Sequence, residues 1–240
     1  MRGAAAAALL AGAYAAAAEP THSLAEDAKA FGSRDFLQGA DISPSGNKVL
    51  LLASAQGAGT TATVIDVATG KMTRVAETSG RPEKLYWCGF AGEEHVVCKF
   101  GGVTQLDMDL VSFSRLFTVR ADGTKMRPLG QEDSGRAAYE RQSDGGIVDW
   151  MTGSEGRLLM ARTYVPDYSN TGHLVSRKKS GLGVDLVDLD SLKTSSVEPA
   201  RDDVGGYLSD GRGNVRLLTS WSWNGDGRLT GVGTGRGCRS

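Results

Sequence analysis

Residues 87–100 read WCGFAGEEHVVCKF, two arms that each carry a cysteine and an aromatic residue around the polar segment AGEE. Aromatic and β-branched residues in the arms favour strands, and a short polar segment between them favours a tight turn. The stretch therefore predicts an antiparallel β-hairpin that turns between Ala91 and Glu94.

Similar hairpins recur on both sides of this one. The repeated segments are ISPSGNKVLLLAS and TATVIDVATGKMTRV before it, and SRLFTVRADGTKMRPL, VDWMTGSEGRLLMAR, LGVDLVDLDSLKTSSV and YLSDGRGNVRLLTS after it. Copies begin near Ile42, Trp87, Trp150 and Tyr207, with Trp150 taken as the equivalent of Trp87, so the period is about 45 to 63 residues.

Repeats of this length with four strands each are the signature of β-propeller blades. We therefore predict an all-β fold, a partial β-propeller of about three to four blades over residues 37–220. A β-sandwich is the alternative, but a sandwich gives no reason for a tryptophan, a turn glycine and a TGK-like corner to repeat in order.

Residues 1–18 predict a secretory signal peptide, because Arg2 precedes an uncharged alanine and leucine run that ends in small residues. The run is shorter and richer in alanine than the ~20 apolar residues of a membrane span. We expect cleavage after Ala18, a periplasmic or secreted protein, and no membrane span after cleavage.

Residues 19–36 are expected to form a short N-terminal helical segment. Leu24, Ala25, Ala28 and Phe31 have helical spacing, and Gly32 supplies a stop.

The last segment, residues 221–240, is rich in glycine and arginine, and the strand pattern fades after Leu218. Because a propeller must close its ring to protect its strand edges, we expect an incomplete ring in a truncated chain. The segment is either a non-native sequence or a flexible glycine-rich tail.

The chain contains three cysteines, and Cys88 and Cys98 are the natural pair, which leaves Cys238 unpaired. Facing positions in a hairpin can bring two Cα atoms within the roughly 4.4–6.8 Å that a disulfide requires. We predict a structural disulfide in an oxidising compartment, with two buried free thiols as the alternative.

The sequence predicts no catalytic, cofactor-binding or metal-binding residues. No G-x-S-x-G string is present. His22, His95 and His173 are predicted to be isolated, exposed histidines, and Glu93 and Glu94 solvated turn residues. Asp185, Asp188 and Asp190 fit a strand that leads into a turn better than a calcium loop. A net charge of −1 gives no indication of a nucleic-acid partner.

The blade-opening segments resemble a known family. ADISPSGNKVLLL resembles the S-P-D-G turn in propellers of the prolyl oligopeptidase family (peptidase family S9) and of TolB-like proteins, with Ser45 where aspartate is usual. The order of WCGFAGEEHVVCKF, SRLFTVRADGTKMRPL, VDWM and YLSDGRGNVRLL is similar to the N-terminal propeller of exported bacterial S9 peptidases. The resemblance runs from Leu24 to Leu218.

Such peptidases join a signal peptide and a propeller to a C-terminal α/β-hydrolase domain that carries the catalytic Ser, Asp and His. None of these three can be assigned in this chain. The resemblance implies a non-catalytic propeller that caps the active site and restricts access to short peptides. A short peptide substrate is therefore the expected partner, and it would bind through the hydrolase domain, which is absent here. In some members a glutamate pair holds the substrate amine, but we do not assign this role to Glu93 and Glu94.

A stand-alone TolB-like periplasmic propeller for protein–protein interaction is the alternative function, and a complete small enzyme is a third hypothesis. The sequence leaves open whether the chain has enzyme activity of its own, and its oligomeric state.

Overall fold

The computed structural model describes residues 23–106, 108–169, 171, 174–175, 180–222 and 225–232. The predicted signal peptide, residues 1–18, lies outside these ranges. The chain divides into two compact units, residues 1–34 and residues 35–240.

The described part of the first unit contains the helix α1, Leu24–Phe31. Ser23 and Glu26 form a capping box in which the Glu26 carboxylate accepts from the Ser23 backbone N–H at 2.8 Å. Gly32 ends the helix and donates its N–H to the Ala28 carbonyl. The helix is shorter than the expected segment 19–36, since residues 33–36 are not helical.

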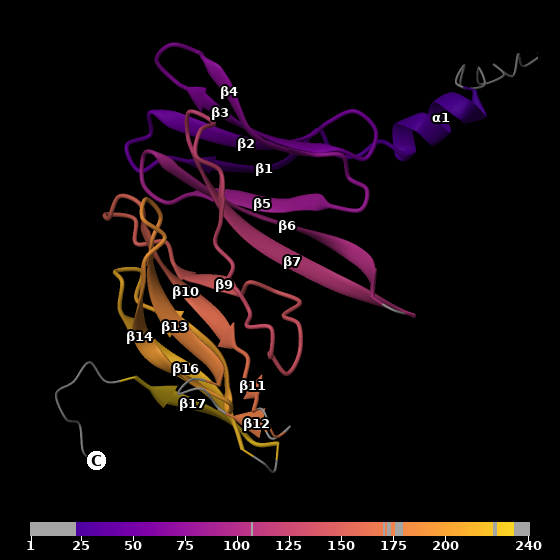
Figure 1. The fold of residues 1–240 in the computed structure, drawn as a ribbon. Helices are drawn as coiled ribbons and strands as arrows, with labels where there is room; N and C mark the ends of the chain where they lie inside the picture. The colour runs from indigo at the N-terminus through magenta and orange to yellow at the C-terminus, as the bar shows by residue number, and fades with distance from the viewer. Residues whose placement is uncertain are drawn as a thin grey trace, which may run out of the picture. The chain divides into compact units, whose positions relative to one another are not determined.

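The second unit consists of antiparallel sheets (Figure 1). We call them blade 1 (β1–β4), blade 2 (β5–β8), blade 3 (order β9-β10-β13-β14) and blade 4 (β15–β17). A short ribbon of β11 and β12 interrupts blade 3 between β10 and β13. The strands are β1 Leu37–Ile42, β2 Lys48–Ser54, β3 Thr60–Asp66, β4 Met72–Thr78, β5 Lys84–Phe90, β6 His95–Leu106, β7 Asp109–Arg120, β8 Arg127–Pro128, β9 Gly146–Asp149, β10 Arg157–Tyr164, β11 Asp167–Tyr168, β12 Leu174–Val175, β13 Gly181–Asp188, β14 Thr194–Arg201, β15 Val204–Ser209, β16 Val215–Trp221 and β17 Gly227–Gly231.

The repeated corners between strands have a common cause. Asp66, Asp122 and Asp188 each accept hydrogen bonds from the backbone N–H and the hydroxyl of a Thr or Ser two or three residues later. Such side-chain bonds fix a tight turn. In the first two corners, Gly70 and Gly123 adopt φ of +68° and +83°, which other residues rarely do.

Three apolar clusters join each blade to the next. Blades 1 and 2 share one core, blades 2 and 3 a second, and blades 3 and 4 a third. Successive residues of a central strand serve different cores: Leu158 packs toward blade 2, and Leu159 toward blade 4. The period-2 alternation of a strand thus buries both faces of blades 2 and 3. The fold is the predicted all-β partial propeller.

The predicted equivalence of Trp87 and Trp150 is wrong. Trp87 lies within β5, whereas Trp150 follows the end of β9. The two rings instead contact each other, 5.7 Å apart between centroids and edge to face, in the core between blades 2 and 3. Matching the two tryptophans in sequence identified contact partners rather than repeat positions.

The structure also differs from the expected tail at residues 221–240. Trp221 is the last residue of β16, and Gly227–Gly231 forms β17, which pairs with β16. Part of this glycine-rich segment therefore belongs to blade 4. Cys238 lies outside the described residues.

Candidate functional site

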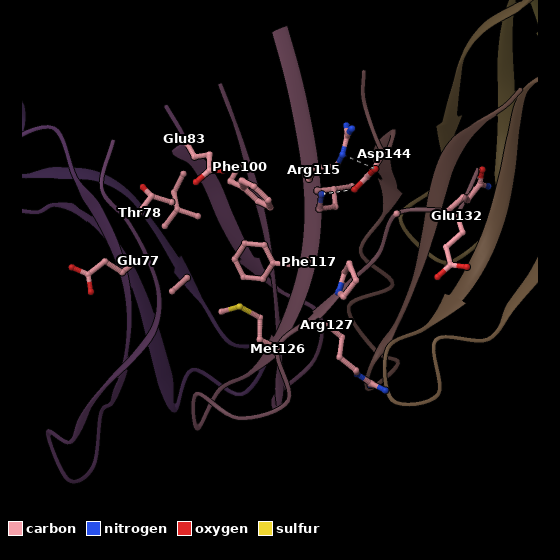
Figure 2. Close-up of a pocket in the computed structure, with 16 residues that line it drawn as sticks. Glu77, Thr78, Glu83, Phe100, Arg115, Phe117, Met126, Arg127, Glu132 and Asp144 are labelled. Atoms are coloured by element: carbon pink, nitrogen blue, oxygen red, sulfur yellow. Dashed lines mark hydrogen bonds and ion pairs between the residues drawn. The ribbon is translucent and has the colours of Figure 1, made fainter. Parts of the chain in front are cut away.

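A cavity of about 640 Å³ opens between blades 1 and 2 (Figure 2). Strand β4 of blade 1, strands β5–β8 of blade 2 and the segment that leads to blade 3 all line it. Its lining residues are Ala76, Glu77, Thr78, Glu83, Leu85, Phe100, Arg115, Leu116, Phe117, Met126, Arg127, Pro128, Gly130, Gln131, Glu132 and Asp144.

The inner wall of the cavity is apolar. Phe100 on β6 and Phe117 on β7 pack with ring centroids 5.8 Å apart and planes tilted by 58°. Leu85 and Met126 extend this surface. Both phenylalanines come from neighbouring strands of one sheet, so their positions are fixed by the β6–β7 ladder, in which Cys98 faces Phe117. This wall is suited to an apolar group of a ligand.

Polar groups surround this wall. Arg115 lies 3.8 Å from Asp144, whose other oxygen accepts a hydrogen bond from the Leu116 N–H at 2.9 Å. Glu83 and Glu132 are exposed carboxylates on the rim. An apolar wall with charged groups around it is suited to binding a ligand in this cavity. The arrangement shows no hydrogen-bonded pair of nucleophile and base among the described lining residues.

A second cavity of about 890 Å³ has a polar lining that includes Gln131, Arg162 and Tyr164. The Tyr164 hydroxyl donates to Asp185, and burial together with this bond raises the pKa of Tyr164. Burial lowers the pKa of the Arg162 guanidinium, which donates to the Leu129 carbonyl at 2.8 Å. The hydrogen bond from Arg162 to the Leu129 carbonyl joins blade 3 to residues 129–145, the segment between β8 and β9.

His95 is not the isolated, exposed histidine that the sequence predicted. Its side chain is buried, with Nδ1 3.0 Å from Glu155 and Nε2 3.4 Å from Asp190. Arg120 also lies 2.6 Å from Asp190. The sequence gave no signal for this cluster, because its members come from turns of blades 2 and 3 that are far apart in the chain. Both ring nitrogens face carboxylates and neither faces a serine.

Glu93 and Glu94 are likewise more than solvated turn residues. Glu93 accepts a hydrogen bond from the Ser45 N–H, and Glu94 lies 2.6 Å from Lys48. Their own backbone N–H groups donate to Glu155. Hydrogen bonds and an ion pair therefore join the first turn of blade 1 to that of blade 2, and hydrogen bonds join the first turn of blade 2 to that of blade 3.

Electrostatics favour the charged form of these carboxylates. Burial opposes it, but the hydrogen bonds from His95 and from the Glu93 and Glu94 N–H groups lower the pKa of Glu155. The bond from Arg120 is the main cause of the lowered pKa of Asp190. The cluster links neighbouring blades.

Cys88 and Cys98, the predicted pair, are joined by a disulfide. They face each other directly in the β5–β6 ladder, with 4.0 Å between the Cα atoms, because the hairpin register places them opposite one another. Cys98 is fully buried, and both residues contribute to the core between blades 1 and 2.

No group of three or more His, Cys, Asp or Glu side chains within the described ranges is arranged to hold a metal ion. His22 and His173 lie outside those ranges. Asp185, Asp188 and Asp190 do not converge: Asp185 bonds Tyr164, Asp188 caps a turn and Asp190 pairs with Arg120. In the described part of the chain, no helix has the length and hydropathy of a membrane span.

No family model matches the chain, and no curated protein sequence matches it. Similar solved structures include an oligogalacturonate lyase in complex with manganese, with 12% identity, a TM-score of 0.42, and coverage of 79% of this chain and 51% of that chain. TolB from Acinetobacter baumannii gives 15% identity, a TM-score of 0.33, and coverage of 82% and 54%.

The β-propeller domain of the trilobed protease from Pyrococcus furiosus gives 11% identity, a TM-score of 0.30, and coverage of 82% of this chain and 72% of that chain. The chain spans about half the length of the lyase and of TolB. Peptidase propellers and TolB-like propellers are thus both among the similar structures.

Proposed function

We propose that this chain is the non-catalytic propeller portion of an exported serine peptidase of the prolyl oligopeptidase type, in which it caps the active site and admits short peptides. The observation that carries the proposal is the order of family-like motifs along the chain, in blades 1, 2 and 4. SPSGN connects β1 to β2, AGEE connects β5 to β6, and DGRGN connects β15 to β16. Each motif therefore occupies the corresponding first turn of its blade.

In this proposal the chemistry belongs to an α/β-hydrolase domain, and the propeller supplies walls that exclude large substrates. The N-terminal signal pattern and the Cys88–Cys98 disulfide support an exported, oxidised protein.

A purified sample of the chain tests the non-catalytic role. We expect neither labelling by a fluorophosphonate nor hydrolysis of short peptide substrates, because the sequence has no G-x-S-x-G nucleophile motif. A fluorophosphonate adduct on any serine, or turnover that follows the chain through purification, would overturn it.

The alternative, a TolB-like propeller that binds proteins, is favoured by one feature. Strands β6 and β7 are 12 residues long, against seven for β2–β5, and their far ends expose apolar side chains. Leu106, Met108 and Leu110 are 46%, 95% and 78% exposed. Such a projecting apolar hairpin is typical of a protein contact.

Cross-linking in the exported fraction separates the two functions. A protein-binding propeller should be linked to partners that do not react with fluorophosphonates, and the double change Met108→Asp and Leu110→Asp should remove those links. Links that persist in the variant would contradict the hairpin's role.

A further inference from the structure

The cavity between blades 1 and 2 continues the apolar core that joins these two blades. Leu85 and Phe117 belong to that core and also line the cavity, and Phe100 packs against the core. Blade 1 contributes Ala76, which is paired with Ala62 on the neighbouring strand. Two alanines fill less volume than the larger side chains of the facing blade, so space is left beside the aromatic rings.

The walls of this cavity are all supplied by residues 76–132 and by Asp144. These residues lie in two adjacent blades and in the segment that follows β8, so the walls do not depend on what precedes residue 76 or follows residue 144. The volume of about 640 Å³ is within the roughly 300–1,000 Å³ that is usual for small-molecule pockets.

A glycine on β6 brings a carboxylate next to the aromatic wall. Phe100 and Gly102 are two residues apart on this strand, so they lie on the same face of it. A Cβ on Gly102 would lie 2.3 Å from the carbonyl oxygen of Pro82, so a glycine is required for the segment before β5 to pass this close. That segment places Glu83 beside Phe100, as Figure 2 shows.

The lining carries more negative than positive charge. It contains four carboxylates and two guanidinium groups, from Glu77, Glu83, Glu132 and Asp144, and from Arg115 and Arg127. An excess of carboxylates around an apolar wall favours a cationic ligand and disfavours an anionic one.

Glu83 is a carboxylate whose charge is available to a ligand. Glu77 lies 2.6 Å from Arg74, and Asp144 lies 3.8 Å from Arg115, so each of these carboxylates has a cationic partner. The Arg127 guanidinium donates to two backbone carbonyls of the turn between β13 and β14. Glu83 and Glu132 are exposed and form no ion pair with any described residue. Of these two, Glu83 lies beside the aromatic wall (Figure 2).

We propose that this cavity binds an organic cation, a compound with an aromatic apolar body and one ammonium group. The body lies against Phe100 and Phe117, and the ammonium lies beside the Glu83 carboxylate. Burial of the body against two phenylalanine rings supplies affinity, and the carboxylate selects the charge. The proposal concerns this cavity alone and does not rest on the peptidase assignment.

An NMR titration of the purified, isotope-labelled chain tests the proposal with three probes that share a phenylalkyl body: phenethylamine, phenethyl alcohol and phenylacetate. Phenethylamine should bind with a Kd of about 1 mM, as expected for a ligand of this size. The alcohol should bind about 3- to 5-fold more weakly, because one exposed ion pair is lost, and the anion more weakly still. The amide shifts should be concentrated at Leu85, Phe100 and Phe117.

Glu83→Gln keeps the shape of the side chain and removes its charge. This variant should bind phenethylamine about 3- to 5-fold more weakly than wild type and bind the alcohol as wild type does, so that the two probes become equivalent. Asp109→Asn is the matched control, because Asp109 is an exposed carboxylate outside the cavity lining. It should keep the preference for the amine.

Ala76→Leu tests the location of the site through volume rather than charge. The longer side chain fills the space beside the rings, so the amine and the alcohol should both bind about tenfold more weakly. Circular dichroism and an intact Cys88–Cys98 bond verify folding, and Ala76→Val replaces Ala76→Leu if that variant fails to fold.

Equal affinities of wild type for the amine and the alcohol would overturn the proposal. A preference for the amine that survives Glu83→Gln, or unchanged binding to a folded Ala76 variant, would overturn it as well. So would shifts confined to residues outside the cavity, or the absence of saturable phenethylamine binding up to about 10 mM.

Discussion

At the scale of single residues, Glu155 connects blade 3 to blade 2. Its carboxylate accepts from His95 and from two backbone N–H groups of the blade 2 turn. The sequence predicts an isolated His95 because the carboxylates that contact it, Glu155 and Asp190, belong to another blade. Contacts of this kind depend on how sheets stack, which local patterns do not encode.

We expect Glu155→Gln to lower the free energy of unfolding by about 1 kcal/mol at neutral pH, because the amide keeps an acceptor but loses the charge, and the site is half exposed. Urea unfolding of wild type and the variant measures this change in the free energy of unfolding. Glu83→Gln, an exposed change on the cavity rim, is the control and should leave stability unchanged.

The pH dependence of this effect has a definite sign. The folded-state pKa of Glu155 is below its ordinary value of 4.5, so the stabilisation is complete above that value and is lost as pH falls through the lowered pKa. The stability difference between wild type and Glu155→Gln should therefore shrink in acid. A constant difference from about pH 7 to pH 3 would contradict this account.

The disulfide is the second residue-scale feature. Its cysteines are 10 residues apart, so the double change Cys88→Ala and Cys98→Ala should cost about 2–3 kcal/mol through the entropy of the unfolded chain. Reductant should lower the unfolding midpoint of wild type and leave that of the variant unchanged. Alkylatable thiols at both positions in unreduced protein would refute the bond.

At the scale of elements, strand positions follow from alternation and turn chemistry. The hairpin at residues 87–100 consists of the last four residues of β5, the turn that follows and the first half of β6. What the pattern lacked was the register between blades, which is why Trp150 was misplaced. The strand β17 was also missed, because Gly227–Gly231 has few residues that favour strands and is held by pairing with β16.

Strand β10 offers a test of burial on both faces. Leu158→Ala and Leu159→Ala should each cost about 2–5 kcal/mol, because each opens a cavity in a different core. Val103→Ala, on the exposed part of β6, should cost less than about 0.5 kcal/mol. Denaturant unfolding compares the three, and a small cost for either leucine would show that one face of blade 3 is open.

At the scale of the whole molecule, the blades contact their successive neighbours through three cores. The repeats in the sequence predict successive blades, but they do not show which face of one blade packs on the next. That depends on the register within each sheet, in which Ile42 lies opposite Val49 and Leu208 opposite Leu217.

The central claim is that this propeller serves a serine peptidase, and activity-based capture tests it most directly. Exported proteins of the source cells are labelled with a biotinylated fluorophosphonate, captured after denaturation and digested. We predict that peptides from residues 35–232 are recovered with those of a serine hydrolase domain on the same polypeptide. Recovery of these peptides only from the uncaptured proteins would contradict it.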